Sequence, residues 1–405
     1  MTAGAGSQPR AGGVAARFVA LDAGRVLAPG LVQWDARGRV TSLRRPRGAE
    51  LQRVEDCAVL PGLVNAHAHL QLPALPRAER RFLPWVRRVI AARAEQSDAA
   101  MRRQAERHLR ELLASGATAV GEIDSTGHTP AALERAPLAG RCYRELTGFH
   151  LRGAEAKAHA RAHWPAATAS MAKGLSPHAP YSVSADLFRA AAARSRHLAV
   201  HCAELPEEQQ FLREGTGPFA ALLASLGRLP ADHRAPGVGA VRHLELLSLL
   251  RETTQLVHCQ ELERGDAARI AAAGASIVVC PGTIRYFRRT PPDVPGWLRR
   301  GIPVGLGTDS RASNEAMSMR RELRLAAELW PSLSPADLLQ MATGHGARAL
   351  GLPLGALRRG RRADLCVVAA AATWQETLEA FVAGEAAVQR VALMGGWQRM
   401  PRGGR

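Results

Sequence analysis

Lysine is almost missing from this basic protein. Its 405 residues carry a formal net charge of +18, yet Lys157 and Lys173 are the only lysines. The positive charge therefore comes from arginine, which is spread from end to end, and short clusters such as Arg288-Arg289 and Arg358-Arg359 lack interleaved aromatic residues. A compositional bias explains this charge at least as well as a nucleic-acid groove does. A basic, non-catalytic nucleic-acid-binding barrel stays the alternative from another class of function.

Long hydrophobic runs and paired cysteine spacings are also missing. No apolar run approaches the ~20 residues that cross a bilayer, and residues 1–13 lack the apolar core of a secretory signal. We expect those residues to form a disordered tail and the protein to be cytoplasmic, with no membrane partner. The cysteines, which we interpret as buried thiols in a reducing compartment, are Cys57, Cys142, Cys202, Cys259, Cys280 and Cys366.

The sequence alternates strand-like and helical segments over most of its length. Short apolar runs occur at 63–69, 117–123, 141–146, 171–176, 198–201, 256–258, 276–280 and 304–307. Segments with helical periodicity lie between them, for example at 99–115, 185–194, 265–273 and 292–300. Eight strand-helix units over about 250 residues predict a (β/α)₈ TIM barrel, with an open doubly wound sheet as the structural alternative.

Both ends of the chain return to β-type patterns. Runs at 18–21, 31–34 and 39–43 precede the barrel, and runs at 363–368 and 387–394 follow it. We expect these ends to pair into one small β-sandwich domain made of residues 14–59 and 355–405, beside a metal-dependent barrel domain at 60–354.

Polar side chains gather at the ends of the predicted strands. His67 and His69, two residues apart, would project from the same face of the first strand. His201, His258 and Asp309 end the fifth, sixth and eighth strands, and catalytic groups of a TIM barrel lie at this end. His178 follows the fourth strand, and the other nine of the 14 histidines, His108 among them, fall in helices or loops and resemble surface residues.

Three imidazoles and one carboxylate are a suitable ligand set for one divalent metal ion. We predict His67, His69, His201 and Asp309 as the ligands, with zinc or iron(II) as the ion. Such an ion would lower the pKa of a water toward ~7 and so supply hydroxide at neutral pH. We predict Glu204 as general acid and base, with Asp309 able to accept the proton of the water.

Two further histidines complete the predicted site. His258 would bond the attacking water or the developing charge, and His178 would contact the substrate. Each residue also has a purely structural interpretation. His178 could cap a turn, His258 could be a core histidine, and Asp309 could cap a helix near 314–323. Glu204 could be an exposed acid, as we expect Glu207 and Glu208 to be.

Taken together, these motifs resemble the amidohydrolase superfamily, in its metal-dependent deaminase and chlorohydrolase branch. The motifs are Pro61–His69, Ser176-Pro177-His178-Ala179-Pro180-Tyr181, His201-Cys202-Ala203-Glu204, Val257-His258-Cys259 and Gly307-Thr308-Asp309-Ser310. The resemblance spans residues 17–395. It implies a TIM barrel with a β-sandwich, a mononuclear zinc or iron(II) site without a carbamylated lysine, and hydrolytic removal of an amine from an aromatic ring.

Within that branch the chain is most similar to aminodeoxyfutalosine deaminases of menaquinone biosynthesis, through residues 204–219 and 305–314. It departs from them after Cys280-Pro281. Where the resemblance leads us to expect an Arg-Ser-His-like run, the chain has Gly282-Thr283-Ile284, followed by Arg285, which we expect to bind substrate.

We therefore expect deamination of a purine-type nucleoside or related heterocycle, with aminodeoxyfutalosine as the first candidate. The alternatives are S-adenosylhomocysteine, adenosine, cytosine or guanine deaminases and triazine-type chlorohydrolases. Its expected partners are the small heterocyclic substrate and water. The sequence leaves the number of subunits open, with a homodimer as one option.

Overall fold

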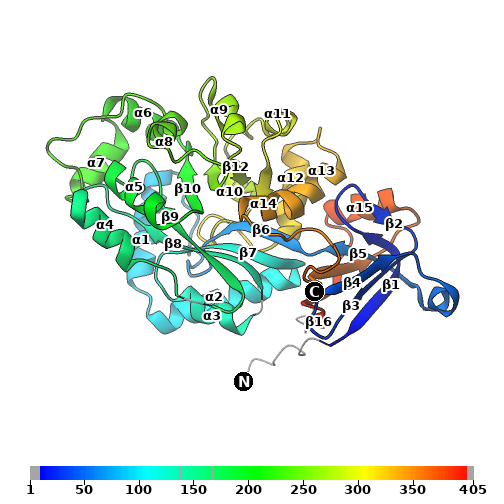
Figure 1. The fold of residues 1–405 in the computed structure, drawn as a ribbon. Coiled ribbons are helices and arrows are strands. Elements are labelled where there is room, and N and C mark those ends of the chain that lie inside the picture. Colours follow the sequence, from blue (N-terminus) through cyan, green and yellow to red (C-terminus); the bar gives the residue numbers. More distant parts are fainter. Residues whose placement is uncertain (1–9, 137, 167, 399–405) are drawn as a thin grey trace.

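Two sheets organise the computed structural model, which describes residues 10–136, 138–166 and 168–398. One is an eight-stranded parallel sheet that forms a nearly closed barrel with helices around it (Figure 1). The other is a mixed sheet built from both ends of the chain, and it lies beside the barrel in the same view. The predicted TIM-barrel class is confirmed.

Each predicted strand of the barrel is present. In chain order they are β6 (Leu63–Ala68), β7 (Ala117–Asp124), β8 (Ala139–Leu146), β9 (Met171–Pro177), β10 (Leu198–Cys202), β11 (Thr254–His258), β12 (Ser276–Val279) and β13 (Val304–Leu306). Each strand pairs in parallel with the next along the chain. Strands such as β10 and β11 are buried at every residue, which explains why they appear in the sequence as continuous apolar runs.

The barrel closes through the residues that directly follow β13. Thr308 and Asp309 donate their backbone N–H groups to the carbonyl of His67, and the N–H of His69 donates to the carbonyl of Asp309. Ala68 and Asp309 form a parallel bridge. The seam of the barrel therefore brings the first and last predicted ligand segments together through backbone hydrogen bonds.

Helices surround the barrel. They are α1 (Phe82–Ala94), α2 (Asp98–Ala114), α3 (Thr129–Arg135), α4 (Gly153–Ala162), α5 (Ala185–Arg194), α6 (Pro206–Glu214), α7 (Pro218–Ser225), α8 (Ala240–Leu246), α9 (Asp266–Ala272), α10 (Pro281–Phe287), α11 (Val294–Arg299), α12 (Met319–Leu329), α13 (Pro335–Gln340), α14 (Gly346–Ala349) and α15 (Trp374–Val382), with a π-helical turn at Met341–His345. A short 3₁₀ helix at Gly48–Arg53 lies between two strands of the mixed sheet. Ser97 and Ser184 cap α2 and α5 by accepting from backbone N–H groups, as serine favours. Among the described residues, every helix is too short or too polar to cross a bilayer.

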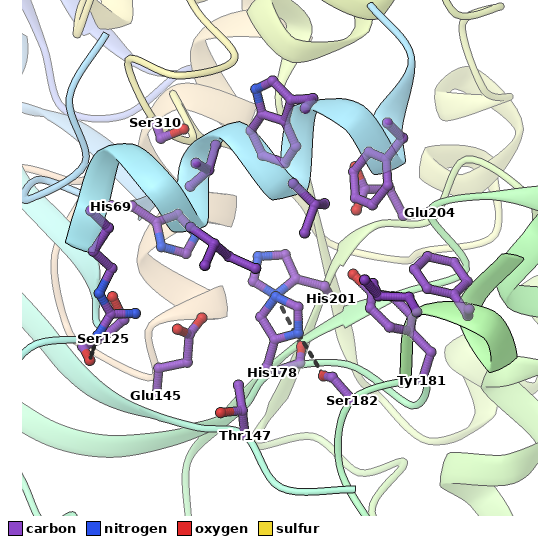
Figure 2. Close-up of a pocket in the computed structure, with 18 of the residues that line it drawn as sticks. His69, Ser125, Glu145, Thr147, His178, Tyr181, Ser182, His201, Glu204 and Ser310 are labelled. Atoms are coloured by element: carbon purple, nitrogen blue, oxygen red, sulfur yellow. Dashed lines mark hydrogen bonds between the residues drawn. The ribbon is translucent and has the colours of Figure 1, made fainter. Parts of the chain in front are cut away.

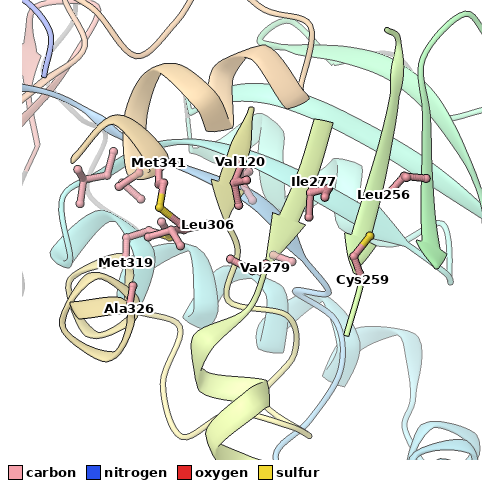
Figure 3. Packing of buried hydrophobic residues seen from close by; sticks show 14 of the residues in the cluster. Val120, Leu256, Cys259, Ile277, Val279, Leu306, Met319, Ala326 and Met341 are labelled. Carbon is pink, nitrogen blue, oxygen red and sulfur yellow. The ribbon is translucent and has the colours of Figure 1, made fainter. Parts of the chain in front are cut away.

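The main core lies between the outer face of the barrel strands and the helices. Ile277 and Val279 of β12 and Leu306 of β13 belong to one buried cluster with Met319 of α12 (Figure 3). The same cluster includes Val120 of β7. This packing holds the strand ends in fixed positions, because close-packed interiors resist displacement.

The ends of the chain form the mixed sheet. Its strands are β1 (Gly12–Ala20), β2 (Val26–Leu27), β3 (Gly30–Trp34), β4 (Val40–Arg44), β5 (Glu55–Pro61), β14 (Leu365–Ala369), β15 (Val388–Leu393) and β16 (Gly396–Trp397). The expected pairing of the two ends is present, because β5 lies between β1 and β14. These strands form one sheet. Val40 in β4 exchanges backbone hydrogen bonds with the segment at 360–361, and the sheet has its own buried cluster.

Two boundaries differ from the expected ones. Strand β1 begins at Gly12, within the segment expected to be a tail, and residues 1–9 of that segment lie outside the described part. Strand β5 of the mixed sheet continues to Pro61, and Gly62 alone separates it from β6 of the barrel. A Cβ atom at Gly62 would collide with Thr118, so this passage requires glycine.

Candidate metal centre and active site

The predicted metal ligands converge at the carboxyl end of the barrel. The ligand nitrogens of His67, His69 and His201 all lie within 4.8 Å of one another, and the three residues are buried. Asp309 Oδ1 is 3.8 Å from His67 Nε2 and 3.7 Å from His69 Nε2. These side chains come from β6 and the residue directly after it, from β10 and from the segment that follows β13, and they lie together at this end of the barrel.

The chemistry of these residues fits a divalent ion. Both ring nitrogens of His67 are buried and lack hydrogen-bond partners among the described residues, which is costly unless another group satisfies them. Burial lowers the pKa of His67 to about 4 and that of His69 to about 3, so both imidazoles are neutral and able to ligate at pH 7. His201 Nδ1 contacts the carbonyl of His178 at 2.9 Å, which leaves Nε2 for the ion.

A second possible ligand set lies beside the first and shares a residue with it. Glu145, His178 and His201 also place ligand atoms within 4.8 Å of one another. Because His201 Nδ1 is occupied by the carbonyl of His178, both sets would need the same Nε2 atom. The two sets are therefore alternatives, and the geometry fits one ion rather than two.

Asp309 is oriented by two hydroxyl groups. Thr283 Oγ1 and Ser313 Oγ donate to Asp309 Oδ2 over 2.9 and 2.8 Å, so Oδ1 is left facing the histidines. Burial alone would raise the pKa of Asp309, but the neighbouring imidazoles hold it well below its usual range. The interpretation of Asp309 as a helix cap is wrong, because α12 begins at Met319 and Ser318 caps it.

The Gly282-Thr283-Ile284 segment supports this carboxylate. Thr283 places a hydroxyl where the resemblance leads us to expect a serine, and that hydroxyl contacts Asp309. Gly282 lies against Asn314 so closely that a Cβ atom would collide with it. The Gly282 N–H donates to Glu322 Oε2 over 2.7 Å, and Asn314 Nδ2 donates to Glu322 Oε1 over 2.7 Å. In this chain the segment therefore packs directly against Asp309 and the residues around it.

Glu204 is a buried acid beside the centre. It is 5% exposed, so its interpretation as an exposed acid is wrong. Arg289 Nη1 donates to Glu204 Oε1 over 2.9 Å, and His258 Nε2 lies 3.9 Å from the same oxygen. Burial would raise the pKa of Glu204, but the charges of His258 and Arg289 outweigh burial and lower it. The group is therefore poised as a carboxylate that can accept a proton.

Glu208 is also buried, which contradicts its expected exposure. Its Oε2 accepts the backbone N–H of Glu204 over 2.8 Å, and burial raises its pKa to about 8. The expectation that His108 is a surface residue is also wrong. Its side chain is buried, with 1% exposure, and its Nδ1 contacts the carbonyl of Leu70, the residue directly after His69. By contrast, all six cysteines are buried and free, as predicted.

The remaining predicted residues divide between the site and the surface. His178 and His258 line the same cavity as His69, His201 and Asp309. His178 also bonds Ser182 Oγ through Nδ1 at 2.7 Å, so it supports a turn as well (Figure 2). Arg285 lies elsewhere: it pairs with Glu328 at 2.7 Å, more than half of its side chain is exposed, and it is outside the lining of this cavity.

Arg289, rather than Arg285, contacts a predicted residue of the site, namely Glu204. Helix α10 ends at Phe287, and Arg288 adopts the left-handed conformation with φ 56°, which turns the chain so that Arg289 reaches Glu204. Its guanidinium lies 4.5 Å from the Phe287 ring centre. The sequence shows Arg288-Arg289 as a short basic cluster but contains no signal for this reversal.

Several strand ends at the site turn sharply. Ala203, His258, Cys259 and Asp309 all have positive φ angles between 50° and 74°. This conformation is unfavourable for residues other than glycine and clusters at functional sites. It directs the segments that follow β10, β11 and β13 across the mouth of the barrel.

The cavity at this end has a volume of about 500 Å³. Figure 2 shows His178 and His201 near its centre, with Glu145 and Thr147 on one side and Tyr181 and Glu204 toward the other. Glu145 is a half-buried carboxylate that sequence reasoning missed, although it is the next-to-last residue of strand β8 and so lies near the same end of the barrel. A cavity of this size accommodates a ligand considerably larger than one bicyclic ring.

Comparison with known proteins agrees with this site. The model of the amidohydrolase family matches residues 58–396. An aminodeoxyfutalosine deaminase of Deinococcus radiodurans is 32% identical over 84% of this chain and 82% of that protein. A 5-methylthioadenosine/S-adenosylhomocysteine deaminase of Haloquadratum walsbyi is 28% identical over 84% of this chain and 81% of that protein.

A solved structure shows the same fold. The Helicobacter pylori aminofutalosine deaminase in complex with methylthio-coformycin superimposes with a TM-score of 0.82 at 22% identity, covering 96% of this chain and 100% of that one. The chain belongs to the amidohydrolase family. It is a metal-dependent deaminase of that family, a hydrolase that acts on carbon–nitrogen bonds other than peptide bonds and takes a small-molecule substrate.

Proposed function

We propose that this enzyme deaminates an aminated purine-type nucleoside and that aminodeoxyfutalosine, an intermediate of menaquinone biosynthesis, is its substrate. The observation that carries the proposal is the convergence of three buried imidazoles, Asp309 and Glu204 on one cavity. The aminodeoxyfutalosine deaminase of Deinococcus radiodurans, 32% identical, supports the choice of substrate. We also propose that the protein is cytoplasmic and that residues 60–354 form its catalytic domain.

His67, His69, His201 and Asp309 would hold one divalent ion, for which zinc is the first candidate and iron(II) the second. Imidazole nitrogens and one carboxylate suit either ion. When bound, such an ion lowers the pKa of a water toward about 7 and withdraws electron density from the substrate.

Glu204 and Asp309 would move the protons of the reaction. Water adds to the ring carbon that carries the amine, and one of its protons passes through Glu204 to the adjacent ring nitrogen. The other passes through Asp309 to the amino group as the carbon–nitrogen bond breaks. The products are ammonia and the ring with a carbonyl in place of the amine.

The other residues would bind and orient. His258, buried and 3.9 Å from Glu204, would hydrogen-bond the oxygen that attacks. Burial lowers the pKa of His178 to about 3, so this imidazole is neutral and would contact the substrate through Nε2, since Nδ1 bonds Ser182. Arg285 has no role in this proposal.

An ammonia-release assay tests the function. The metal-loaded enzyme is given aminodeoxyfutalosine, 5′-methylthioadenosine, S-adenosylhomocysteine, adenosine, cytosine and guanine, with and without prior chelation. We expect the fastest turnover with aminodeoxyfutalosine and its loss after chelation and in His67→Ala. If the protein contains stoichiometric metal and releases no ammonia from any of these compounds, the proposal is rejected.

A second candidate is deamination of 5′-methylthioadenosine or S-adenosylhomocysteine. The relative from Haloquadratum walsbyi, 28% identical over similar coverage, favours it. The same assay separates the two candidates by their relative kcat/KM values.

A further inference from the structure

The backbone of His69, a proposed metal ligand, is held on both of its polar sides. His69 directly follows Ala68, the last residue of β6, so it lies just beyond the end of that strand. Its N–H donates to the carbonyl of Asp309 over 3.3 Å, and its carbonyl accepts the N–H of Leu72 over 3.3 Å. The direction of a side chain follows its backbone, so these two bonds restrict where the imidazole of His69 can point.

Leu70, the next residue, has both of its backbone polar groups held by side chains. Its nitrogen donates to Glu122 Oε2 over 3.0 Å, and its carbonyl accepts from His108 Nδ1 over 2.8 Å. Glu122 lies on β7 directly opposite Ala68, so its carboxyl group meets the chain just after the strand pairing ends. His108 lies on the buried face of α2, which packs against β7 (Figure 1). Two different elements therefore fix the chain beside His69.

These two polar side chains lie in the main apolar core and not at the cavity. Glu122 and His108 are 0% and 1% exposed, and both are outside the cavity lining. Leu70 and Leu109 beside them belong to the large apolar cluster. Burying polar groups in such surroundings is unfavourable unless they are hydrogen-bonded. The backbone that follows His69 supplies a partner to each of them.

The contacts of His108 define which ring nitrogen carries the proton. A carbonyl only accepts, so Nδ1 donates to Leu70, and Nε2 accepts from the side-chain amide nitrogen of Gln104. Burial lowers the pKa of His108 to about 4, so the ring is neutral at pH 7 and keeps this arrangement. The exposed Arg107 donates in turn to the amide oxygen of Gln104. A chain of hydrogen bonds therefore runs through α2 to the backbone beside His69.

Resting on the metal site of the proposed function, we propose that Glu122 and His108 are positioning residues that orient His69 toward the metal ion. They act through the backbone of Leu70, from the side of the barrel wall that faces the helices. Groups that fix the orientation of a ligand strengthen metal binding. His67 lies within β6, where the sheet itself holds the backbone, whereas His69 lies past the strand end and depends on these side chains.

Zinc affinity tests this role through matched pairs of variants, measured by competition with a chromophoric chelator. Glu122→Leu and His108→Phe remove the hydrogen bonds and keep the bulk, and each should weaken zinc binding by about 10- to 100-fold. Glu122→Gln keeps an oxygen acceptor and His108→Asn keeps a nitrogen donor, so both should stay within about threefold of the wild type. Burial raises the pKa of Glu122 well above its usual range, which favours the uncharged acid and makes glutamine a close match.

Cobalt(II) in place of zinc gives a second readout that a purely structural role would not change. The visible absorption of bound cobalt depends on ligand geometry, so Glu122→Leu should alter the spectrum at saturating cobalt and Glu122→Gln should reproduce that of the wild type. The Tm of each metal-free protein is measured in parallel. His243→Phe, which replaces a buried histidine of α8 outside the cavity lining, is the control and should leave zinc affinity and cobalt spectrum unchanged.

Gln104→Met keeps the test decisive if Glu122→Leu does not fold. It removes only the donor to His108 Nε2 and should weaken zinc binding by about threefold or more. A lower Tm of metal-free Glu122→Leu and His108→Phe, together with wild-type zinc affinity and cobalt spectrum, overturns the inference, because the pair would then only stabilise the fold. Zinc binding by the wild type that His69→Ala leaves intact rejects the proposed metal site instead.

Discussion

Arg289 Nη1 donates to Glu204 Oε1 over 2.9 Å, and this pair lies almost entirely out of solvent, with side-chain exposures of 13% and 6%. The guanidinium rests between the rings of Phe287 and Phe82, at 4.5 and 5.7 Å. Aromatic faces stabilise a cation in this arrangement and restrict its position. Arg289 therefore holds the carboxylate of the proposed acid and base at a fixed position.

Arg289→Gln should lower kcat by about 10- to 100-fold, because Glu204 loses the contact that orients it for proton transfer. KM should change little. Guanidine added to the assay should restore part of the rate of Arg289→Ala, which a general loss of structure would prevent. Arg285→Gln is the matched control, since Arg285 pairs with Glu328 outside the cavity. An unchanged kcat in Arg289→Gln would show that Glu204 needs no such partner.

Thr283→Val should weaken metal binding by about 10- to 100-fold, the usual effect of removing a hydrogen bond to a ligand. The variant keeps the shape of the side chain but leaves Asp309 Oδ2 with Ser313 as its hydroxyl donor. Thr283→Ser retains the hydroxyl and should bind metal like the wild type. Competition with a chromophoric chelator measures both. Equal affinities in the valine and serine variants would contradict the role assigned to Thr283.

Zinc should stabilise the folded protein through the three histidines. At a free concentration of about 100 times Kd, binding adds roughly 2.7 kcal/mol to the free energy of unfolding. Thermal unfolding with zinc and with a chelator should therefore show a higher Tm for the wild type with zinc. His69→Ala should show no increase in Tm with zinc. His128 pairs with Asp98 instead, so His128→Ala is the control and should show the same increase in Tm as the wild type. A zinc response in His69→Ala equal to that of the wild type would exclude this centre.

Glu208 should make the protein less stable as pH rises. Burial raises its pKa from an ordinary 4.5 to about 8, so the folded state retains a proton that the unfolded state releases. Its contribution to stability is complete below pH 4.5 and is lost as pH rises to about 8, by an amount on the order of 5 kcal/mol. Glu208→Gln should resemble the wild type near pH 5 and exceed it in denaturant midpoint near pH 9.

Glu214→Gln is the control for that experiment, because Glu214 is exposed on the same helix. Its pH profile should follow that of the wild type. If the stabilities of Glu208→Gln and the wild type differ by the same amount at pH 5 and pH 9, the proton on Glu208 contributes nothing.

The sequence was sufficient for the barrel and for the approximate position of the metal centre. Strands buried on both faces appear as continuous apolar runs, and a parallel barrel places all their carboxyl ends at one mouth. Residues at strand ends, such as His67, His201 and Asp309, could therefore be grouped before any coordinates. The burial of a strand and the polar residue at its end both depend on a short stretch of chain, so both can be recognised in the sequence.

Only the tertiary structure decided which side chains from helices and loops join that group. Arg289 reaches Glu204 because Arg288 reverses the chain, and Glu208 and His108 are buried because other elements cover them. The apolar face of α1 looks in sequence like any amphipathic helix, and its position over the cavity became visible only after folding. Contacts between elements depend on packing distances and angles that the whole chain sets. No single position in the sequence therefore predicts them.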